Sequence, residues 1–190
     1  RCRGYRECVK GCPYKKTFFN PMTRVSEKCV GCYPAVEQGR QTQCTITCIG
    51  KIRLQGFISR PDEIREDNPI DYIVHVAKIA KPLYPQFGLE PHVYYIPPVH
   101  VPAPYLQQMF GFGVPEAIAT YRRVNDDKKL LGALLLFGAP MIIHHYKVEG
   151  SGVTGYDENN HEITWVPFTE PTYIRAAYDP QHETWRTNIT

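Results

Sequence analysis

The stretch Cys2-Arg-Gly-Tyr-Arg-Glu-Cys-Val-Lys-Gly-Cys-Pro opens the 190-residue chain with three cysteines spaced C-x5-C-x3-C and followed at once by proline. A second group, Cys29, Cys32, Cys44 and Cys48, has the spacing C-x2-C-x11-C-x3-C. These two groups hold all seven cysteines of the chain, and none follows Cys48. Any chemistry that depends on sulfur therefore belongs to the N-terminal part of the sequence.

Charge is divided in the same way as the cysteines. Residues 1–60 carry twelve Lys or Arg against three Asp or Glu, whereas the rest of the chain carries ten against sixteen. A basic, cysteine-rich segment suits an anionic partner, which is either a nucleic acid or an anionic group bound within the segment. The chain is 12% aromatic, which excludes low-complexity disorder, and no apolar run is long enough to predict a membrane span.

The cysteine spacings separate the possible uses of sulfur. The bacterial ferredoxin run is C-x2-C-x2-C-x3-C-P, and the first group matches it with Tyr5 at the position of the second cysteine. In that run the last cysteine, after three intervening residues, binds a different cluster from the others. A zinc site fits the second group alone but leaves the C-x3-C-P run unexplained, and an odd number of cysteines argues against a disulfide framework. Iron–sulfur ligation accounts for both groups, and it gives the basic residues an anionic cluster to offset.

The motifs also resemble a known family. Together with Ser26-Glu-Lys-Cys-Val-Gly-Cys-Tyr-Pro and Cys44-Thr-Ile-Thr-Cys-Ile-Gly-Lys-Ile-Arg, they look like the four-cluster iron–sulfur beta subunits of molybdenum enzymes of the dimethyl sulfoxide reductase superfamily. Within it they are most similar to the group of nitrate, perchlorate and selenate reductases, nitrite oxidoreductase and ethylbenzene dehydrogenase. Residues 1 to about 57 carry the match, and Leu89-Glu-Pro-His-Val-Tyr-Tyr-Ile-Pro-Pro extends it. The segment Pro167-Phe-Thr-Glu-Pro-Thr-Tyr-Ile-Arg favours nitrite oxidoreductase.

The resemblance implies a set of ligands. Such subunits carry four cysteine motifs, of which this sequence holds the last two, so further ligands are expected in an N-terminal portion absent from this chain. Cys2 and Cys8 look like ligands of a [3Fe–4S] cluster, with Tyr5 where relatives have an aromatic residue in place of a cysteine. Cys12 and Cys48 look like remote fourth ligands of two different [4Fe–4S] clusters. Three ligands of another [4Fe–4S] cluster are implied to be Cys29, Cys32 and Cys44.

The resemblance also implies a function. It predicts a non-catalytic electron-transfer subunit, which relays electrons between a molybdopterin-containing alpha subunit and a haem-containing gamma subunit or cytochrome. The complex is expected at a membrane, on the periplasmic side in preference to the cytoplasmic side, with no membrane span in this chain. No catalytic triad, P-loop or carboxylate pair is evident in the sequence. The alternative interpretation is a zinc-stabilised basic module that binds nucleic acid.

The predicted fold is α+β, in two regions. Residues 1–60, hereafter the cysteine region, are expected to form an incomplete ferredoxin-like unit. Residues 61–190 are expected to hold a docking segment, short helices and a small antiparallel sheet. Asp67-Asn-Pro predicts the start of a helix that continues to about Ala80. Residues 81–105 contain seven prolines, which predicts an extended segment lying along the catalytic subunit.

Two further helices and a sheet are predicted beyond that segment. One helix should run from Pro115 to about Tyr121, and Asp126 should cap another that continues through Phe137. From Met141 the apolar period falls to two, with turn sequences at residues 150–152 and 158–160, which predicts a hairpin or three-stranded sheet ending near Phe168. The adjacent histidines 144 and 145 should point to opposite faces of a strand and so should not share a metal ion.

The position of Tyr5 generates a first testable prediction. In the complete subunit, the centre beside Tyr5 should give the paramagnetic signal of an oxidised [3Fe–4S] cluster. Tyr5→Cys supplies the missing thiolate, so it should convert this centre to [4Fe–4S] and lower its reduction potential, because an added anionic ligand stabilises the oxidised form. Electron paramagnetic resonance of both proteins measures this. A three-iron signal that is absent from the wild type, or unchanged in the variant, would contradict the assignment.

Overall fold

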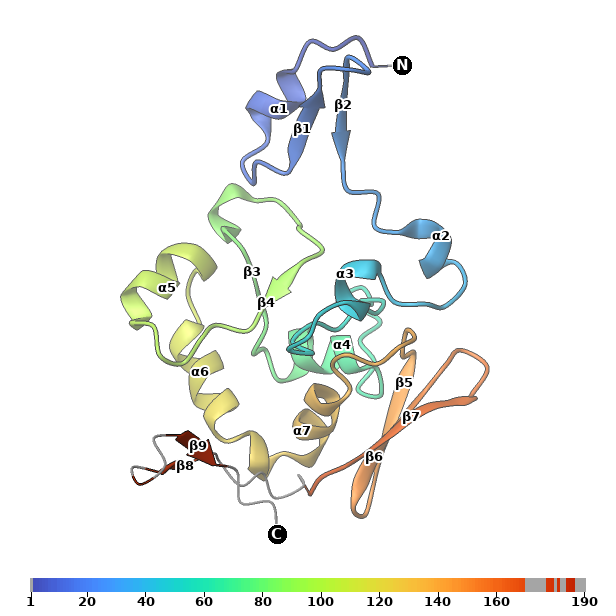
Figure 1. Ribbon diagram of the computed structural model, residues 1–190, viewed down its shortest axis with the longest axis vertical. Coiled ribbons are helices and arrows are strands. Elements are labelled where there is room, and N and C mark those ends of the chain that lie inside the picture. The colour runs from blue at the N-terminus through green and yellow to red at the C-terminus, as the bar shows by residue number, and fades with distance from the viewer. Residues whose placement is uncertain (1, 170–176, 180, 182–183, 187–190) are drawn as a thin grey trace.

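The computed structural model describes residues 2–169, 177–179, 181 and 184–186. Short helices and small antiparallel sheets alternate along these residues, which confirms the α+β prediction (Figure 1). Most of the C-terminal segment that favoured nitrite oxidoreductase, from residue 170 onward, lies outside the described residues.

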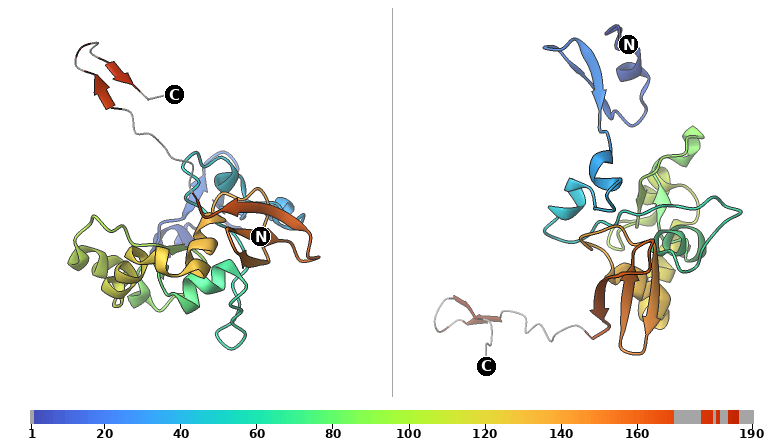
Figure 2. Two further views of the ribbon diagram at one scale, coloured as in Figure 1. Left: turned by 90° about the horizontal axis from the view of Figure 1, so that it is seen from below. Right: turned by 90° about the vertical axis from the view of Figure 1, so that its right-hand side faces the viewer.

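The cysteine region forms a helix, a hairpin and two single-turn helices. Helix α1 (Glu7–Gly11) precedes the antiparallel strands β1 (Thr17–Asn20) and β2 (Val25–Lys28). Helices α2 (Tyr33–Val36) and α3 (Gln43–Ile46) follow. In two perpendicular views α1 and the hairpin stand away from the rest of the molecule, whereas α3 lies against it (Figures 1 and 2).

The helix predicted after Asn68 is present but shorter than expected. Asn68 caps it, because its side-chain oxygen accepts a hydrogen bond from the backbone N–H of Ile70 at 3.0 Å. One turn of α-helix, α4 (Pro69–Asp71), passes into a π-helical turn, η1 (Tyr72–Val76). The prediction that the helix reaches Ala80 is wrong. Lys78 adopts a left-handed conformation with φ of 54°, which a continuing right-handed helix does not allow.

The proline-rich segment is only partly extended. Strand β3 (Lys81–Pro82) pairs with β4 (Tyr94–Tyr95), and the 3₁₀ turn η2 (Pro85–Phe87) lies between them. Helix α5 (Ala103–Phe110) begins inside the stretch that was predicted to be extended, which corrects that prediction. A proline in the first helical turn loses no hydrogen bond, because the N–H groups there have no partner within the helix. The last prolines of the segment thus mark the start of a helix.

The next helix, α6 (Val114–Arg122), confirms the prediction based on Pro115. The 3₁₀ turn η3 (Val124–Asp126) connects it to α7 (Lys128–Leu135).

The cap of α7 corrects a further prediction. The residue that caps it is Asp127, whose Oδ1 accepts hydrogen bonds from the N–H groups of Lys129 and Leu130, both at 3.0 Å. The prediction of Asp126 is wrong because that residue belongs to η3. The helix also ends at Leu135, two residues before the predicted Phe137.

The predicted sheet is three-stranded and antiparallel. Its strands are β5 (His145–Glu149), β6 (Gly152–Tyr156) and β7 (Glu162–Pro167), in the order β5-β6-β7. The turns lie where the sequence indicated, and the sheet ends one residue before Phe168. A separate hairpin pairs β8 (Ala177–Asp179) with β9 (Thr184–Arg186).

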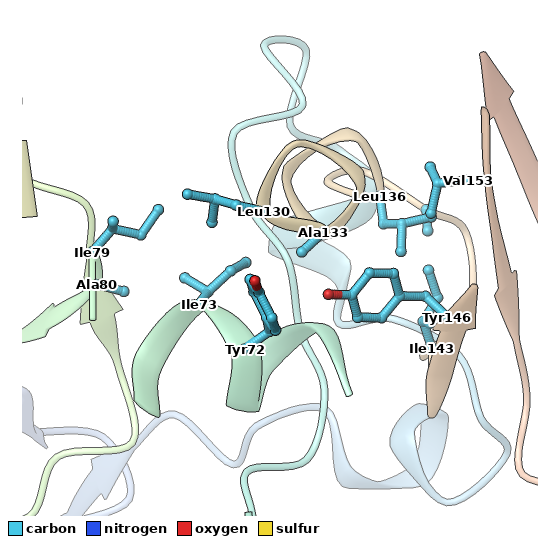
Figure 3. Packing of buried hydrophobic residues seen from close by; sticks show 11 residues of the cluster. Tyr72, Ile73, Ile79, Ala80, Leu130, Ala133, Leu136, Ile143, Tyr146 and Val153 are labelled. Atoms are coloured by element: carbon cyan, nitrogen blue, oxygen red, sulfur yellow. The ribbon is translucent and has the colours of Figure 1, made fainter. Parts of the chain in front are cut away.

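Among the residues that the structure describes, two hydrophobic clusters hold the C-terminal region together. The larger one lies between η1, α7 and the sheet, where the Tyr72 and Tyr146 rings meet edge to face at 6.4 Å between centroids (Figure 3). The smaller one lies between α5 and α6 and contains Leu106, Phe110, Val114 and Ile118. Within the described ranges, no helix has the length and apolarity that a membrane span requires.

A buried carboxylate joins the end of the cysteine region to this core. Asp71 is fully buried, and its two oxygens accept hydrogen bonds from the backbone N–H groups of Ser59 at 2.8 Å and Arg65 at 3.1 Å. The Asn68 side chain donates to the carbonyl of Phe57 at 2.8 Å. These contacts close the loop formed by residues 59–65 at its base.

We therefore expect Asp71→Ala to lower the free energy of unfolding by about 3 kcal/mol, because it leaves two backbone donors without partners. Asp62→Ala, which changes an exposed acidic residue of the same loop, is the matched control and should change this free energy by less than about 0.5 kcal/mol. Urea denaturation of the two variants measures the difference. Equal midpoints would show that the Asp71 contacts do not stabilise the fold.

Candidate metal centre

All seven cysteines are free thiols, and each is at least partly accessible to solvent. In the first group, Cys2 precedes α1, Cys8 lies within it, and Cys12 is its C-cap. In the second group, Cys29 directly follows β2 and Cys32 is the N-cap of α2. Cys44 lies within α3, and Cys48 lies just beyond its C-terminal end. Every predicted ligand is thus on a short element or on a loop beside one.

Backbone N–H groups point at several of the sulfurs. Cys2 Sγ lies 3.4 Å from the backbone nitrogens of both Gly4 and Ser26, so it is held between its own loop and strand β2. These hydrogen bonds, first the one from Ser26 and then the one from Gly4, hold the pKa of the Cys2 thiol below its usual value. The backbone therefore favours the thiolate, which is the form that binds metal.

The same arrangement recurs at Cys12 and Cys29. The N–H of Lys16 donates to Cys12 Sγ at 3.4 Å and lowers the pKa of that thiol. The N–H of Gly31 donates to Cys29 Sγ at 3.3 Å. Hydrogen bonds of this kind to ligating sulfurs are one of the means by which proteins set the potential of iron–sulfur clusters.

The C-x2-C loop of the second group is tightly curved. Gly31 and Cys32 both have left-handed backbone conformations, with φ of 69° and 52°. This conformation costs a residue other than glycine about 1 kcal/mol, so Cys32 bears the cost and Gly31 does not. Together the two residues turn the chain between Cys29 and α2. The strain is consistent with a loop shaped for its ligands.

The second group is attached to the core through glutamine side chains. Gln41 is 1% exposed, and its Nε2 donates to the carbonyl oxygens of Gln55 at 3.1 Å and Met141 at 2.9 Å. The Gln55 side chain accepts from the backbone N–H of Thr42 at 3.0 Å. No sequence pattern indicates these contacts, because glutamines in a polar stretch give no signal of burial.

The first group is attached more lightly, through Tyr14. Its hydroxyl donates to the carbonyl of Leu83 at 3.1 Å, and its ring lies 6.2 Å from that of Phe87. Part of the proline-rich segment thus lies against the cysteine region of its own chain. The prediction that this segment lies along a catalytic subunit stays a prediction.

The sulfurs do not gather around one point. In the part of the chain that the structure describes, no three His, Cys, Asp or Glu side chains are placed to hold a metal ion together. The convergence of Cys29, Cys32 and Cys44 therefore stays a prediction, as do the roles of the other cysteines and of Tyr5, which is 79% exposed. His144 and His145 pack on different aromatic rings, those of Phe57 at 5.2 Å and Tyr156 at 5.0 Å.

The donor set fits iron–sulfur clusters. Free thiols, backbone N–H groups directed at sulfur and a basic surrounding are what an anionic thiolate-bound cluster requires. Residues 1–57 also match the family described as the 4Fe-4S dicluster domain.

Comparison with known proteins leads to the same result. Over 144 residues the chain is 38% identical to the beta subunit of dimethylsulfide dehydrogenase from Rhodovulum sulfidophilum, a match that covers 68% of the chain and 43% of the relative. Over 137 residues it is 42% identical to the beta subunit of selenate reductase from Thauera selenatis, covering 63% and 40%. The chain is a homologue of these beta subunits. This beta-subunit homologue is also 31% identical over 144 residues to the respiratory nitrate reductase 1 beta chain of Escherichia coli, covering 52% and 28%.

The beta-subunit homologue spans only about two fifths of the length of the first two relatives. The family resemblance implied that the cysteine region is an iron–sulfur domain of the beta-subunit type, and this prediction is confirmed. The comparisons give no support to the alternative of a zinc-stabilised module that binds nucleic acid.

The lowered pKa of Cys2 gives a prediction for the cluster-free chain. Because the thiolate is the nucleophile, the rate of alkylation at Cys2 should rise through its midpoint at a lower pH in the folded chain than in the same chain unfolded in urea. Mass spectrometry of labelled peptides over a pH series measures both midpoints. Coincident midpoints would show that the N–H groups of Gly4 and Ser26 do not stabilise the thiolate.

Proposed function

We propose that this chain is part of the electron-transfer beta subunit of a molybdopterin oxidoreductase, and that its seven cysteines are ligands of iron–sulfur clusters. The observation that carries the proposal is the coincidence of three features in residues 1–57. These are the two cysteine groups, the N–H groups directed at sulfur, and the match to the 4Fe-4S dicluster domain. Such clusters supply one-electron transfer at potentials that their surroundings set.

The ligand roles follow the implied assignment. Cys2 and Cys8 are ligands of a [3Fe–4S] cluster, and Tyr5 occupies the place of the absent thiolate. Cys12 and Cys48 each complete a [4Fe–4S] cluster whose other ligands lie elsewhere. Spacing supports this division, since three residues between cysteines at the end of each group direct the last thiolate away from the others. Cys29, Cys32 and Cys44 hold three corners of a further [4Fe–4S] cluster.

The protein's own residues prepare the site for anionic clusters. The N–H groups of Gly4, Lys16 and Gly31 donate to sulfur, and the surplus of Lys and Arg in the cysteine region offsets the negative charge. Because these groups offset negative charge, they favour the reduced form of a cluster, which is the more negative one, and so raise the reduction potential of that cluster.

The partners of the complex are an alpha subunit with molybdopterin and a haem-containing gamma subunit or cytochrome. Exposed apolar side chains on and near the proline-rich segment support a docking role, above all Tyr105 and the 97% exposed Phe112. The substrate belongs to the alpha subunit, and we propose nitrite or nitrate on the resemblance of residues 167–175. The proposal includes a complex at a membrane, on its periplasmic side.

Serine variants of the complete subunit in its complex test the ligand roles. Cys29→Ser and Cys44→Ser should abolish the electron paramagnetic resonance signal of the same [4Fe–4S] cluster, whereas Cys48→Ser should abolish a different one. The reason is that a hydroxyl replaces thiolate poorly at iron. Thr47→Ser, which changes the residue beside Cys48 but no thiol, is the matched control and should retain every signal.

A wild-type complex that is colourless, unaffected by dithionite and loaded with zinc at these cysteines would contradict the proposed function. Loss of one and the same signal in the Cys29, Cys44 and Cys48 variants would keep the electron-transfer function but overturn the division of ligands.

A further inference from the structure

Thr42 occupies the N-cap of α3 but does not cap the helix with its side chain. A threonine at this position ordinarily accepts a hydrogen bond from an N–H of the first turn through its hydroxyl. Here the hydroxyl oxygen instead lies 3.4 Å from Cys44 Sγ and 3.0 Å from the hydroxyl oxygen of Thr45. The side chain is therefore directed at a sulfur and away from the backbone donors of its own helix.

The chemistry of sulfur fixes the direction of these hydrogen bonds. A thiolate bound to metal carries no proton and only accepts, so the Thr42 hydroxyl must donate to Cys44 Sγ. With its proton so used, Thr42 Oγ1 accepts from the hydroxyl of Thr45. The result is a two-step chain of donors, from Thr45 to Thr42 to the sulfur, in which each bond polarises the next.

The surroundings hold this chain of hydroxyls in place. The backbone N–H of Thr42 donates to the Gln55 side chain at 3.0 Å, and the preceding residue, Gln41, is anchored to the core by its buried amide. Thr45 is 4% exposed, so water does not compete freely for its hydroxyl. Among residues 2–60, only Gln41 and Thr45 are buried. Thr45 is one of the two hydroxyl residues, and Gln41 directly precedes the other.

We infer that Thr42 is a positioning residue whose hydroxyl, supported by Thr45, raises the reduction potential of the cluster bound by Cys44. This inference rests on the proposed function, which supplies the cluster. Reduction adds negative charge that spreads onto the thiolates, so a donor to sulfur stabilises the reduced form more than the oxidised form. The effect is local, because the hydroxyl reaches Cys44 alone among the cysteines.

The test is a potentiometric titration of the complete subunit in its complex, followed by electron paramagnetic resonance. Thr42→Val removes the hydroxyl but keeps the β-branched shape and breaks no capping bond. We expect the midpoint potential of one [4Fe–4S] cluster to shift to a lower value, with all other midpoints and all signal intensities unchanged. Thr42→Ser keeps a hydroxyl and should keep the wild-type potential.

The matched control is Thr47→Val. Thr47 lies at the other end of the same helix, and its hydroxyl donates to the backbone carbonyl of Gln43 at 2.8 Å. It should leave every midpoint at the wild-type value. A similar shift in this variant would show that any lost hydroxyl in α3 has the effect, and it would overturn the specific role of Thr42.

Thr45→Val tests the second step of the chain. It should lower the same midpoint by less than Thr42→Val does, because it weakens the donor without removing it. It also keeps the inference testable where Thr42→Val fails to assemble its cluster: an unchanged midpoint in Thr45→Val would then overturn the chain of donors.

A spectroscopic readout is independent of potential. Electron–nuclear double resonance of the wild type should show a proton coupling that exchanges in D₂O and that is missing from Thr42→Val. Suppose that Thr42→Val keeps its cluster signals, with unchanged midpoint potentials and an unchanged exchangeable proton coupling. This result would overturn the inference and leave the proposed function standing. Absence of iron–sulfur signals from the wild type would instead overturn the proposed function.

Discussion

The amide of Gln41 is the contact on which the placement of the cysteine region depends. It is buried, and it bonds carbonyl groups of Gln55, in the same region, and of Met141, one hundred residues away in the sequence. A buried amide without partners is costly, so these bonds fix where α3 and its cysteine lie relative to the core. The N–H of Ile142, which donates to the carbonyl of Gly39 at 2.8 Å, continues the same junction. The second cysteine group is thereby joined to the C-terminal region, which has a hydrophobic core.

The cysteine region itself has no such core. Among residues 2–60, all of which the structure describes, no hydrophobic side chain is buried. Its cohesion comes from a short hairpin, from backbone donors to sulfur, and from contacts such as the Arg6 guanidinium 3.9 Å above the Phe19 ring. In small metal-binding units the binding of the metal supplies folding free energy that packing does not. A region built in this way is suited to iron–sulfur clusters, because their ligands take the place of a core.

The errors of the sequence-based predictions have particular physical causes. The prolines of residues 81–105 predict an extended segment, yet α5 begins at Ala103 because prolines are tolerated in a first helical turn. Asp126 and Asp127 are adjacent, and either residue type can cap a helix. Asp127 is the cap of α7 because a helix that begins there directs Leu130 toward the core. Lys78 ends the helix after Asn68 through a left-handed conformation that no local pattern indicated. At α7 only the boundaries were misplaced, whereas at η1 and α5 the type of element also differed from the prediction.

The sequence by itself identified the iron–sulfur region and the three-stranded sheet of this protein. Cysteine spacing identified the iron–sulfur region because a ligand loop is a local object, whose geometry depends on how many residues separate its donors. Period and turn residues likewise located the three-stranded sheet. Only the tertiary structure decided that Gln41 is buried and that Asp71 closes a loop. It also decided that the Thr42 hydroxyl contacts the sulfur of Cys44 instead of capping its helix. Those choices depend on groups brought together from distant parts of the chain, and polar side chains give no sign in sequence of the partners that folding will provide.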